Sequence, residues 1–161
     1  MVPFFYNPNI HPLIEFRKRL KAFEVYAERE GLDAEQDSEY GLVRFLEQVG
    51  PTGSGRCPVC YRERLGRTAR LAAERGADAF STTMIASPHQ DPDAIRAAGE
   101  QAAAEFGVAF LYEDLRGRAE HGRETARKLS LYRQQYCGCI FSEYERYKDT
   151  RVEVYRGRLR P

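Results

Sequence analysis

The sequence predicts an α/β fold, in which the short strands of a parallel sheet alternate with amphipathic helices. Three short runs indicate strands, at 2–6, 78–84 and 108–111, because brief apolar or β-favouring runs bounded by turn residues are typical of strands. The residues between these runs show apolar spacings of three and four, which are typical of helices. Strands that alternate with helices indicate a parallel sheet with helical crossovers.

The first predicted helix follows Pro12, which suits the first turn of a helix, and ends at Gly31. Its apolar residues share one face: Leu13, Phe16, Leu20, Phe23 and Ala27. We expect Lys18, Arg19 and Lys21 on its other faces. Further helices are predicted over 42–49, 58–75 and 92–106, and a last one runs up to residue 131.

The length of 161 residues predicts a single α/β domain over 1–161, with 143–161 as a peripheral C-terminal extension. No run is long and apolar enough to cross a bilayer, and we expect no membrane partner and a cytoplasmic protein. Ligands of parallel sheets bind beyond the carboxyl ends of the strands. The loops expected there are 7–12, 84–91, 112–118 and 132–142.

The four cysteines form two close pairs, Cys57 with Cys60 and Cys137 with Cys139. In a reducing cytosol, paired cysteines bind metal or do redox chemistry more often than they form structural disulfides. Three interpretations stay open: four thiolates around zinc or an iron–sulfur cluster, one ligand pair beside one redox pair, or four inert thiols. Cys57 and Cys60 open a predicted helix, whose start is expected to lower their thiol pKa values.

Other candidate residues give weaker signals than the cysteines, and each has a structural alternative. Asp114 follows a predicted strand. It could serve there as a proton donor or an iron ligand, and its structural alternative is an ion pair with Arg116. Thr82 and Thr83 lie at the end of another predicted strand. They are candidates for ligand binding, and the alternative is that they are there because threonine favours β structure. The net charge is only +1, but basic residues concentrate over 116–133. This segment is either a phosphate-binding surface or a solvated helix face, and the second is the better interpretation from this segment alone. These residues are Arg116, Arg118, Arg123, Arg127, Lys128 and Arg133.

Four motifs in order resemble the QueH family of epoxyqueuosine reductases. The first runs from Tyr6 to Pro12, with Glu15 and Arg19 after it, and the second is Arg56-Cys57-x-x-Cys60-Tyr61-x-x-Arg64-Leu65-x-x-Thr68-Ala69. The third comprises Phe80-Ser81-Thr82-Thr83 and Ser87-Pro88-His89-Gln90. The fourth runs from Leu131 to Ser142 through Tyr136-Cys137-Gly138-Cys139. Together they span residues 4–142, nearly the whole chain.

The resemblance implies the reduction of the epoxide on a modified wobble base, in the anticodon loop of tRNA, to the alkene of queuosine, with loss of the oxygen as water. It implies a Rossmann-like sheet related to nucleotide alpha-hydrolases, a 4Fe-4S cluster with the option of a second iron, and an electron donor of unknown identity. We assign Cys57 and Cys60 as cluster ligands. Cys137 and Cys139 are assigned as the redox pair, since a Cys-x-Cys disulfide closes a small, strained ring and is readily reduced again.

The remaining assignments complete the site expected from this resemblance. Asp114 is expected to donate a proton or bind a second iron. Substrate contacts are expected from seven residues: Asn7, Asn9, His11, Thr82, Thr83, Arg116 and Arg133. Arg118, Arg123 and Arg127 are expected to contact tRNA phosphates.

The sequence departs from the family pattern at its front, where members usually begin with a strand ending in Cys-Cys-x-Pro-Cys. This chain starts at the following strand. We expect that the true chain begins upstream, that another chain covers the gap, or that this is an altered, inactive relative. A cluster held by all four cysteines, and a non-catalytic zinc-bound RNA-binding module, also stay open. An ATP-using enzyme is the third rival, although no phosphate-binding loop is present.

Overall fold

The computed structural model describes residues 1–150. The part of the predicted C-terminal extension from 151 to 161 lies outside the described residues, and the part before it begins within a helix. Among the described residues, no helix is both long and apolar enough to cross a membrane.

Two parallel β-α-β units form the α/β architecture. In the first, β1 (Phe4–Phe5) pairs with β2 (Glu35–Gln36), and α1 (Leu13–Arg29) makes the crossover. In the second, β3 (Ala79–Phe80) pairs with β4 (Ala109–Phe110), and α4 (Pro92–Phe106) makes the crossover. Parallel neighbours need such a crossover because a tight turn can join only antiparallel strands.

The structure confirms the predicted α/β class with parallel strands flanked by helices, in keeping with a Rossmann-like fold. It also shows two separate two-stranded sheets, whereas the sequence suggested a single sheet. The strand β2 was not predicted, because Glu35 and Gln36 are polar and carry no strand pattern. The run at 78–84 pairs only at Ala79–Phe80 and continues into the 3₁₀ helix η1 (Thr83–Ala86).

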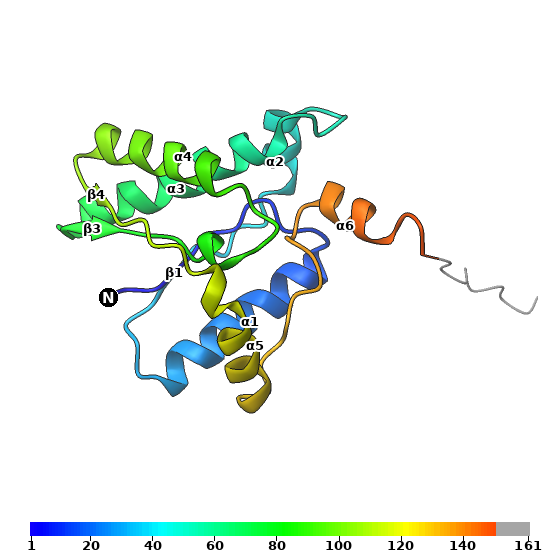
Figure 1. The fold of residues 1–161 in the computed structure, drawn as a ribbon, viewed down its shortest axis with the longest axis horizontal. Coiled ribbons are helices and arrows are strands. Elements are labelled where there is room, and N and C mark those ends of the chain that lie inside the picture. The colour runs from blue at the N-terminus through cyan, green and yellow to red at the C-terminus, as the bar shows by residue number, and fades with distance from the viewer. Residues whose placement is uncertain (151–161) are drawn as a thin grey trace, which may run out of the picture.

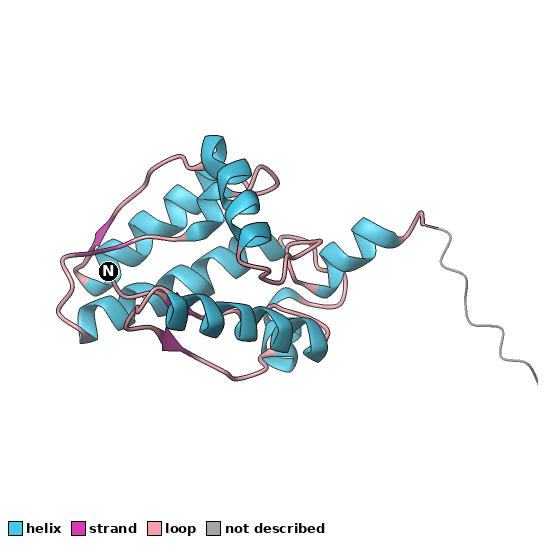
Figure 2. Ribbon diagram, turned by 90° about the horizontal axis from the view of Figure 1, so that it is seen from below, coloured by secondary structure: helices cyan, strands magenta, loops and turns pink. Residues whose placement is uncertain are grey.

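Helices cover the strands on both sides (Figure 1). Helices α3 (Arg56–Glu74) and α4 lie side by side on one side of the strands, and α1 lies on the other side with α5 (Ala119–Lys128). Figure 2 shows how short the strands are beside the helices and the long loops. The remaining elements are α2 (Leu42–Val49), the 3₁₀ helix η2 (Arg116–Arg118) and α6 (Ile140–Tyr147).

The largest apolar core lies between α3, α4 and the second sheet. Leu65, Ala69 and Ile95 are at most 1% exposed there. Helix α4 approaches β4 closely at Gly99, where an added Cβ would lie 2.2 Å from the Phe110 ring. A second core, built from Phe5, Ile10 and Phe16, lies beneath α1. This packing orients α1 and α3, the two helices from which the site is built.

Candidate active site

The four cysteines come together where α3 and α6 begin. Cys57 and Cys60 lie in the first two turns of α3, and Cys139 is the N-cap residue of α6. Cys139 is only 4% exposed and belongs to an apolar cluster with two α2 side chains, and Cys60 and Cys137 border this cluster. Cys57 lies close enough to Cys137 for their charges to interact. The tertiary fold therefore joins two pairs that are far apart in sequence.

A glycine-rich loop supports this arrangement. Gly53 has φ +62°, and an added Cβ there would meet the Phe141 ring at 2.6 Å. The Arg56 guanidinium lies 5.6 Å from the centre of the same ring and pairs with Glu145 at 2.6 Å. The loop before α3 can therefore lie directly against the start of α6, which places the two cysteine pairs beside each other.

Cys137 and Cys139 affect each other's ionisation. The interaction between the two neighbouring thiols lowers the pKa of Cys137 to about 5 and raises the pKa of Cys139. Ser142 adds a contact, since its backbone N–H donates to the Cys139 sulfur at 3.4 Å. The opposite directions of the two pKa shifts favour ionisation of Cys137 before Cys139. A thiolate beside a thiol is the form in which a dithiol starts redox exchange.

The thiols of α3 behave differently. Desolvation raises the pKa of Cys57, and it raises the pKa of Cys60 to about 11. The expectation that the helix start lowers these pKa values is therefore wrong, because desolvation outweighs the neighbouring cations. One of those cations is Arg64, whose charge acts on both Cys60 and Cys137.

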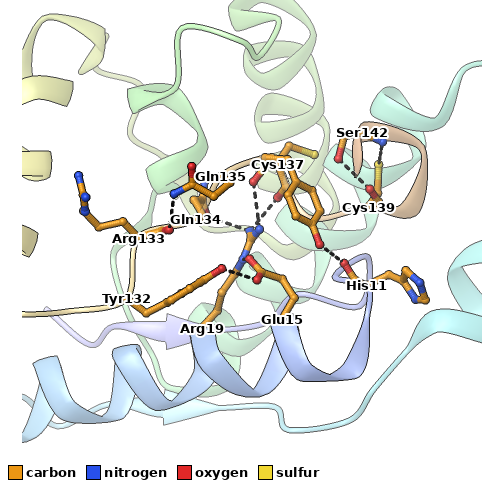
Figure 3. A network of polar contacts seen from close by, with 11 residues as sticks. His11, Glu15, Arg19, Tyr132, Arg133, Gln134, Gln135, Cys137, Cys139 and Ser142 are labelled. Atoms are coloured by element: carbon orange, nitrogen blue, oxygen red, sulfur yellow. Dashed lines mark hydrogen bonds and ion pairs between the residues drawn. The ribbon is translucent and has the colours of Figure 1, made fainter. Parts of the chain in front are cut away.

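The loop that carries Cys137 is held by α1 (Figure 3). Arg19 donates from Nη1 to the Cys137 carbonyl at 2.9 Å and from Nη2 to the Tyr136 carbonyl at 3.0 Å. Its Nε donates to Glu15 at 2.7 Å, and Glu15 also accepts a hydrogen bond from Tyr132. Glu15 and Arg19 side chains are 8% and 9% exposed. Arg19 is therefore not solvated, since the Cys-x-Cys loop covers it, which its predicted position outside the apolar face of the helix did not reveal.

The predicted substrate-binding residues of the 7–12 loop lie beside the Cys-x-Cys turn. His11 donates its backbone N–H to the Gly138 carbonyl at 2.8 Å, and its ring Nδ1 lies 2.9 Å from the Tyr40 hydroxyl. Asn9 is 1% exposed, and its side-chain oxygen has no hydrogen-bond partner among the described residues. Asn7 is half-buried, and its carbonyl accepts the Ile10 N–H at 3.3 Å.

The other predicted residues lie on the surface loops that follow β3 and β4. Thr82 caps η1 by accepting the Met84 N–H at 3.2 Å, and Thr83 is exposed. Asp114 makes a two-pronged ion pair with Arg116, which lowers the pKa of Asp114 to about 2. This pairing is the structural alternative given for Asp114, and its role as a proton donor or iron ligand stays a prediction.

Basic residues around α5 are partly neutralised. Arg123 and Arg127 both pair with Glu120, whereas Arg118 and Arg133 form no ion pair within residues 1–150. Arg133 is exposed on the segment that leads to Cys137. The unpaired cations of this surface are thus the better candidates for phosphate contacts.

Comparison with known proteins decides the family. The profile of the family described as epoxyqueuosine reductase QueH matches residues 1–145. The chain belongs to the QueH family. Epoxyqueuosine reductase QueH of Dehalococcoides mccartyi is 41% identical over 144 residues, which cover 89% of this chain and 79% of that protein. The Thermotoga maritima enzyme of the same name is 38% identical over 165 aligned residues, which cover 96% and 85% of the two chains.

The donor set of this QueH chain fits part of an iron–sulfur site. Cys57 and Cys60 are three residues apart on one helix face, and thiolates are the ligands that iron–sulfur clusters use. Within residues 1–150, however, no group of three or more His, Cys, Asp or Glu side chains is arranged to hold a metal ion. The α3 pair therefore supplies two of the thiols that such a site needs.

Proposed function

We propose that this chain reduces epoxyqueuosine to queuosine at the wobble base of tRNA. The observation that carries the proposal is the neighbouring Cys137 and Cys139 thiols, which lie beside a second thiol pair in a member of this reductase family. Membership of the family supports the substrate class, and the thiol pair supports the kind of chemistry.

For one turnover, the proposed reaction balances with this cysteine pair and one proton from solvent. Both C–O bonds of the epoxide break, and the two carbons become a C=C bond. The Cys137 thiolate and the Cys139 thiol supply two electrons and one proton, and the second proton comes from solvent. Their sulfurs become joined in a disulfide, and the oxygen leaves as water. A further electron donor must then reduce the disulfide, and a thiol reductant can replace that donor in the test tube.

The surroundings of the pair support this chemistry. The neighbouring Cys139 thiol and the Arg64 charge both favour the thiolate form of Cys137. Such preorganised donors stabilise anionic sulfur without rearrangement during the reaction. The same groups discourage premature protonation of Cys137 between turnovers.

Cys57 and Cys60 are proposed as two ligands of a 4Fe-4S cluster. When bound, such a cluster would pass single electrons towards the site. Their exposure differs, with Cys57 exposed and Cys60 half-buried, so a cluster held there would be accessible from one side. Tests for it are the iron and sulfide content and the visible spectrum of anaerobically purified protein.

Replacement of single cysteines tests the proposal. We expect Cys137→Ser and Cys139→Ser to abolish conversion of an epoxyqueuosine-containing tRNA anticodon stem-loop, measured as loss of one oxygen by mass spectrometry. Both variants should keep their iron, whereas Cys57→Ser and Cys60→Ser should lose it. Epoxide reduction that persists in Cys139→Ser would contradict the redox role. Loss of iron from Cys137→Ser would show that Cys137 is a ligand, and zinc without iron would favour a non-catalytic RNA-binding module.

A further inference from the structure

The fourth motif lies on a segment with little regular structure of its own. Between α5 and α6 the chain runs through 129–139 with no helix or strand. A loop of this kind does not by itself hold two sulfurs in a fixed relation, because each residue keeps backbone freedom. The contacts that fix it must therefore come from other elements.

Arg19 supplies more of those contacts than any other residue. One guanidinium binds three groups of the loop: the Tyr136 carbonyl at 3.0 Å, the Cys137 carbonyl at 2.9 Å and the Gln134 side-chain oxygen at 2.8 Å. It also lies 5.5 Å from the centre of the Tyr136 ring. Arg suits this task because its planar fork offers five donors in fixed directions, which a Lys ammonium does not.

Glu15 in turn fixes Arg19. Its two oxygens accept from Arg19 Nε and from the Tyr132 hydroxyl, so one carboxylate joins the helix and the loop. Both charged side chains are more than nine-tenths buried. A buried charge pair is retained at a cost in desolvation, and here it gives the loop a rigid anchor on α1.

A third set of contacts closes the turn from the other side. The Tyr136 hydroxyl donates to the His11 carbonyl, and the His11 N–H donates to the Gly138 carbonyl at 2.8 Å. Gly138 has φ +129° and lies close to Arg19, since an added Cβ would be 3.1 Å from Nη1. The peptide groups on both sides of Gly138 are thus tied to α1 or to the loop that precedes it.

We propose that Arg19, anchored by Glu15 and Tyr132, is a positioning residue that holds the Cys137–Cys139 dithiol ready for disulfide formation. This inference rests on the proposed redox role of the pair. By fixing the carbonyls of Tyr136 and Cys137, Arg19 raises the effective concentration of one sulfur at the other. A higher effective concentration favours the disulfide, which makes the dithiol a stronger reductant. Loosening the loop should therefore weaken it as a reductant.

The test measures the dithiol–disulfide equilibrium without any tRNA. The full-length protein is equilibrated in buffers of reduced and oxidised dithiothreitol, alkylated and digested with trypsin. Cleavage after Arg133 and Arg146 releases a peptide that contains Cys137 and Cys139 and no other cysteine, so its mass reports their oxidation separately from Cys57 and Cys60.

We expect Arg19→Lys to shift this equilibrium towards the dithiol by about tenfold, which corresponds to about 30 mV in the positive direction. Tyr132→Phe removes only the hydroxyl that reaches Glu15, and should shift the equilibrium the same way by a smaller factor. Arg29→Lys is the matched control, because Arg29 lies on the same helix and donates to the Leu129 carbonyl at 2.6 Å, away from the turn. It should leave the equilibrium unchanged.

Two further measurements distinguish a variant that has lost its fold from one with an altered dithiol–disulfide equilibrium. Far-UV circular dichroism and thermal unfolding identify a variant that has lost its fold, and Tyr132→Phe then decides the outcome. Equilibria unchanged from the wild type in folded Arg19→Lys, or in Tyr132→Phe, would overturn the positioning role. A shifted equilibrium in a protein that never reduces epoxyqueuosine would uphold it and reject the proposed function. In an active enzyme, we expect Arg19→Lys to lower kcat with little change in KM, because the Arg19 guanidinium is buried and binds Glu15 and the loop.

Discussion

At the scale of single residues, Gly138 lies between the two proposed redox cysteines, and its backbone conformation favours glycine. Its φ of +129° is accessible to glycine and rarely to other residues. An added Cβ would lie 3.0 Å from Ile10 Cγ1 and 3.1 Å from Arg19 Nη1. The central residue of the Cys-x-Cys turn is thus restricted both by its own backbone and by its neighbours.

We expect Gly138→Ala to lower the free energy of unfolding by about 1–3 kcal/mol, because it adds backbone strain and a crowded methyl group. It should also reduce epoxide conversion at least tenfold, since the turn moves. Urea unfolding and single-turnover conversion measure the two effects. Gly66→Ala is the control: Gly66 lies inside α3 with open space around it, so this change should stabilise the protein by about 0.5–1 kcal/mol. If Gly138→Ala and Gly66→Ala had equal effects, position 138 would not require glycine.

At the scale of elements, the local signals in the sequence predicted most helices. Asp91, Pro92 and Gly107 bracket α4, where the Asp91 carboxylate accepts the N–H groups of Asp93 and Ala94, both at 3.0 Å. Gly107 ends the helix at φ +68°. The predicted last helix was less accurate, because α5 ends at Lys128, and Leu129 lies beyond it.

The Asp91 cap is worth a measurable part of the stability. Asp91→Ala leaves two N–H groups at the start of α4 without their acceptor, so we expect the free energy of unfolding to fall by about 0.5–2 kcal/mol. Asp91→Asn keeps the acceptor and should lose much less. Chemical denaturation of both variants at pH 7 compares them. A loss in Asp91→Asn as large as that in Asp91→Ala would mean that charge, and not the cap, stabilises this helix start.

One strand and one α-helix were not predicted at all. β2 is polar and two residues long, and a strand of this kind exists only because β1 presents hydrogen-bonding groups beside it. α6 starts directly after Cys139 within the stretch given to a ligand loop and a peripheral extension. Its first turn packs Phe141 against the Gly53 loop, a contact between distant residues that local spacing does not reveal.

At the scale of the whole molecule, positive and negative charges nearly cancel, but they are unevenly distributed over the surface. The chain carries a formal net charge of +1. Near the site, Arg116, Arg123 and Arg127 are engaged with carboxylates, and Arg133 has no such partner among residues 1–150. An RNA backbone can therefore be contacted by Arg133 without first breaking an ion pair.

We expect binding of the tRNA anticodon stem-loop to weaken steeply with salt, because each phosphate contact releases counterions. Arg133→Gln should lower the affinity and reduce the slope of log K against log salt by about one. Arg123→Gln should have the smaller effect, since Glu120 already neutralises Arg123. Fluorescence anisotropy over a range of salt concentrations measures both. A slope unaffected by Arg133→Gln would remove Arg133 from the binding surface.

The sequence by itself determined the α/β class, the helices that local caps and apolar spacing define, and the family, because these depend on residues close together in the chain. It also singled out the two cysteine pairs. Only the tertiary structure decided how the site works: that the pairs meet, that desolvation raises the thiol pKa values on α3, and that Arg19 and Glu15 lie buried under the Cys-x-Cys loop. Those properties depend on desolvation and on contacts across more than a hundred residues, such as that from Arg19 to Cys137, which helical periodicity does not encode.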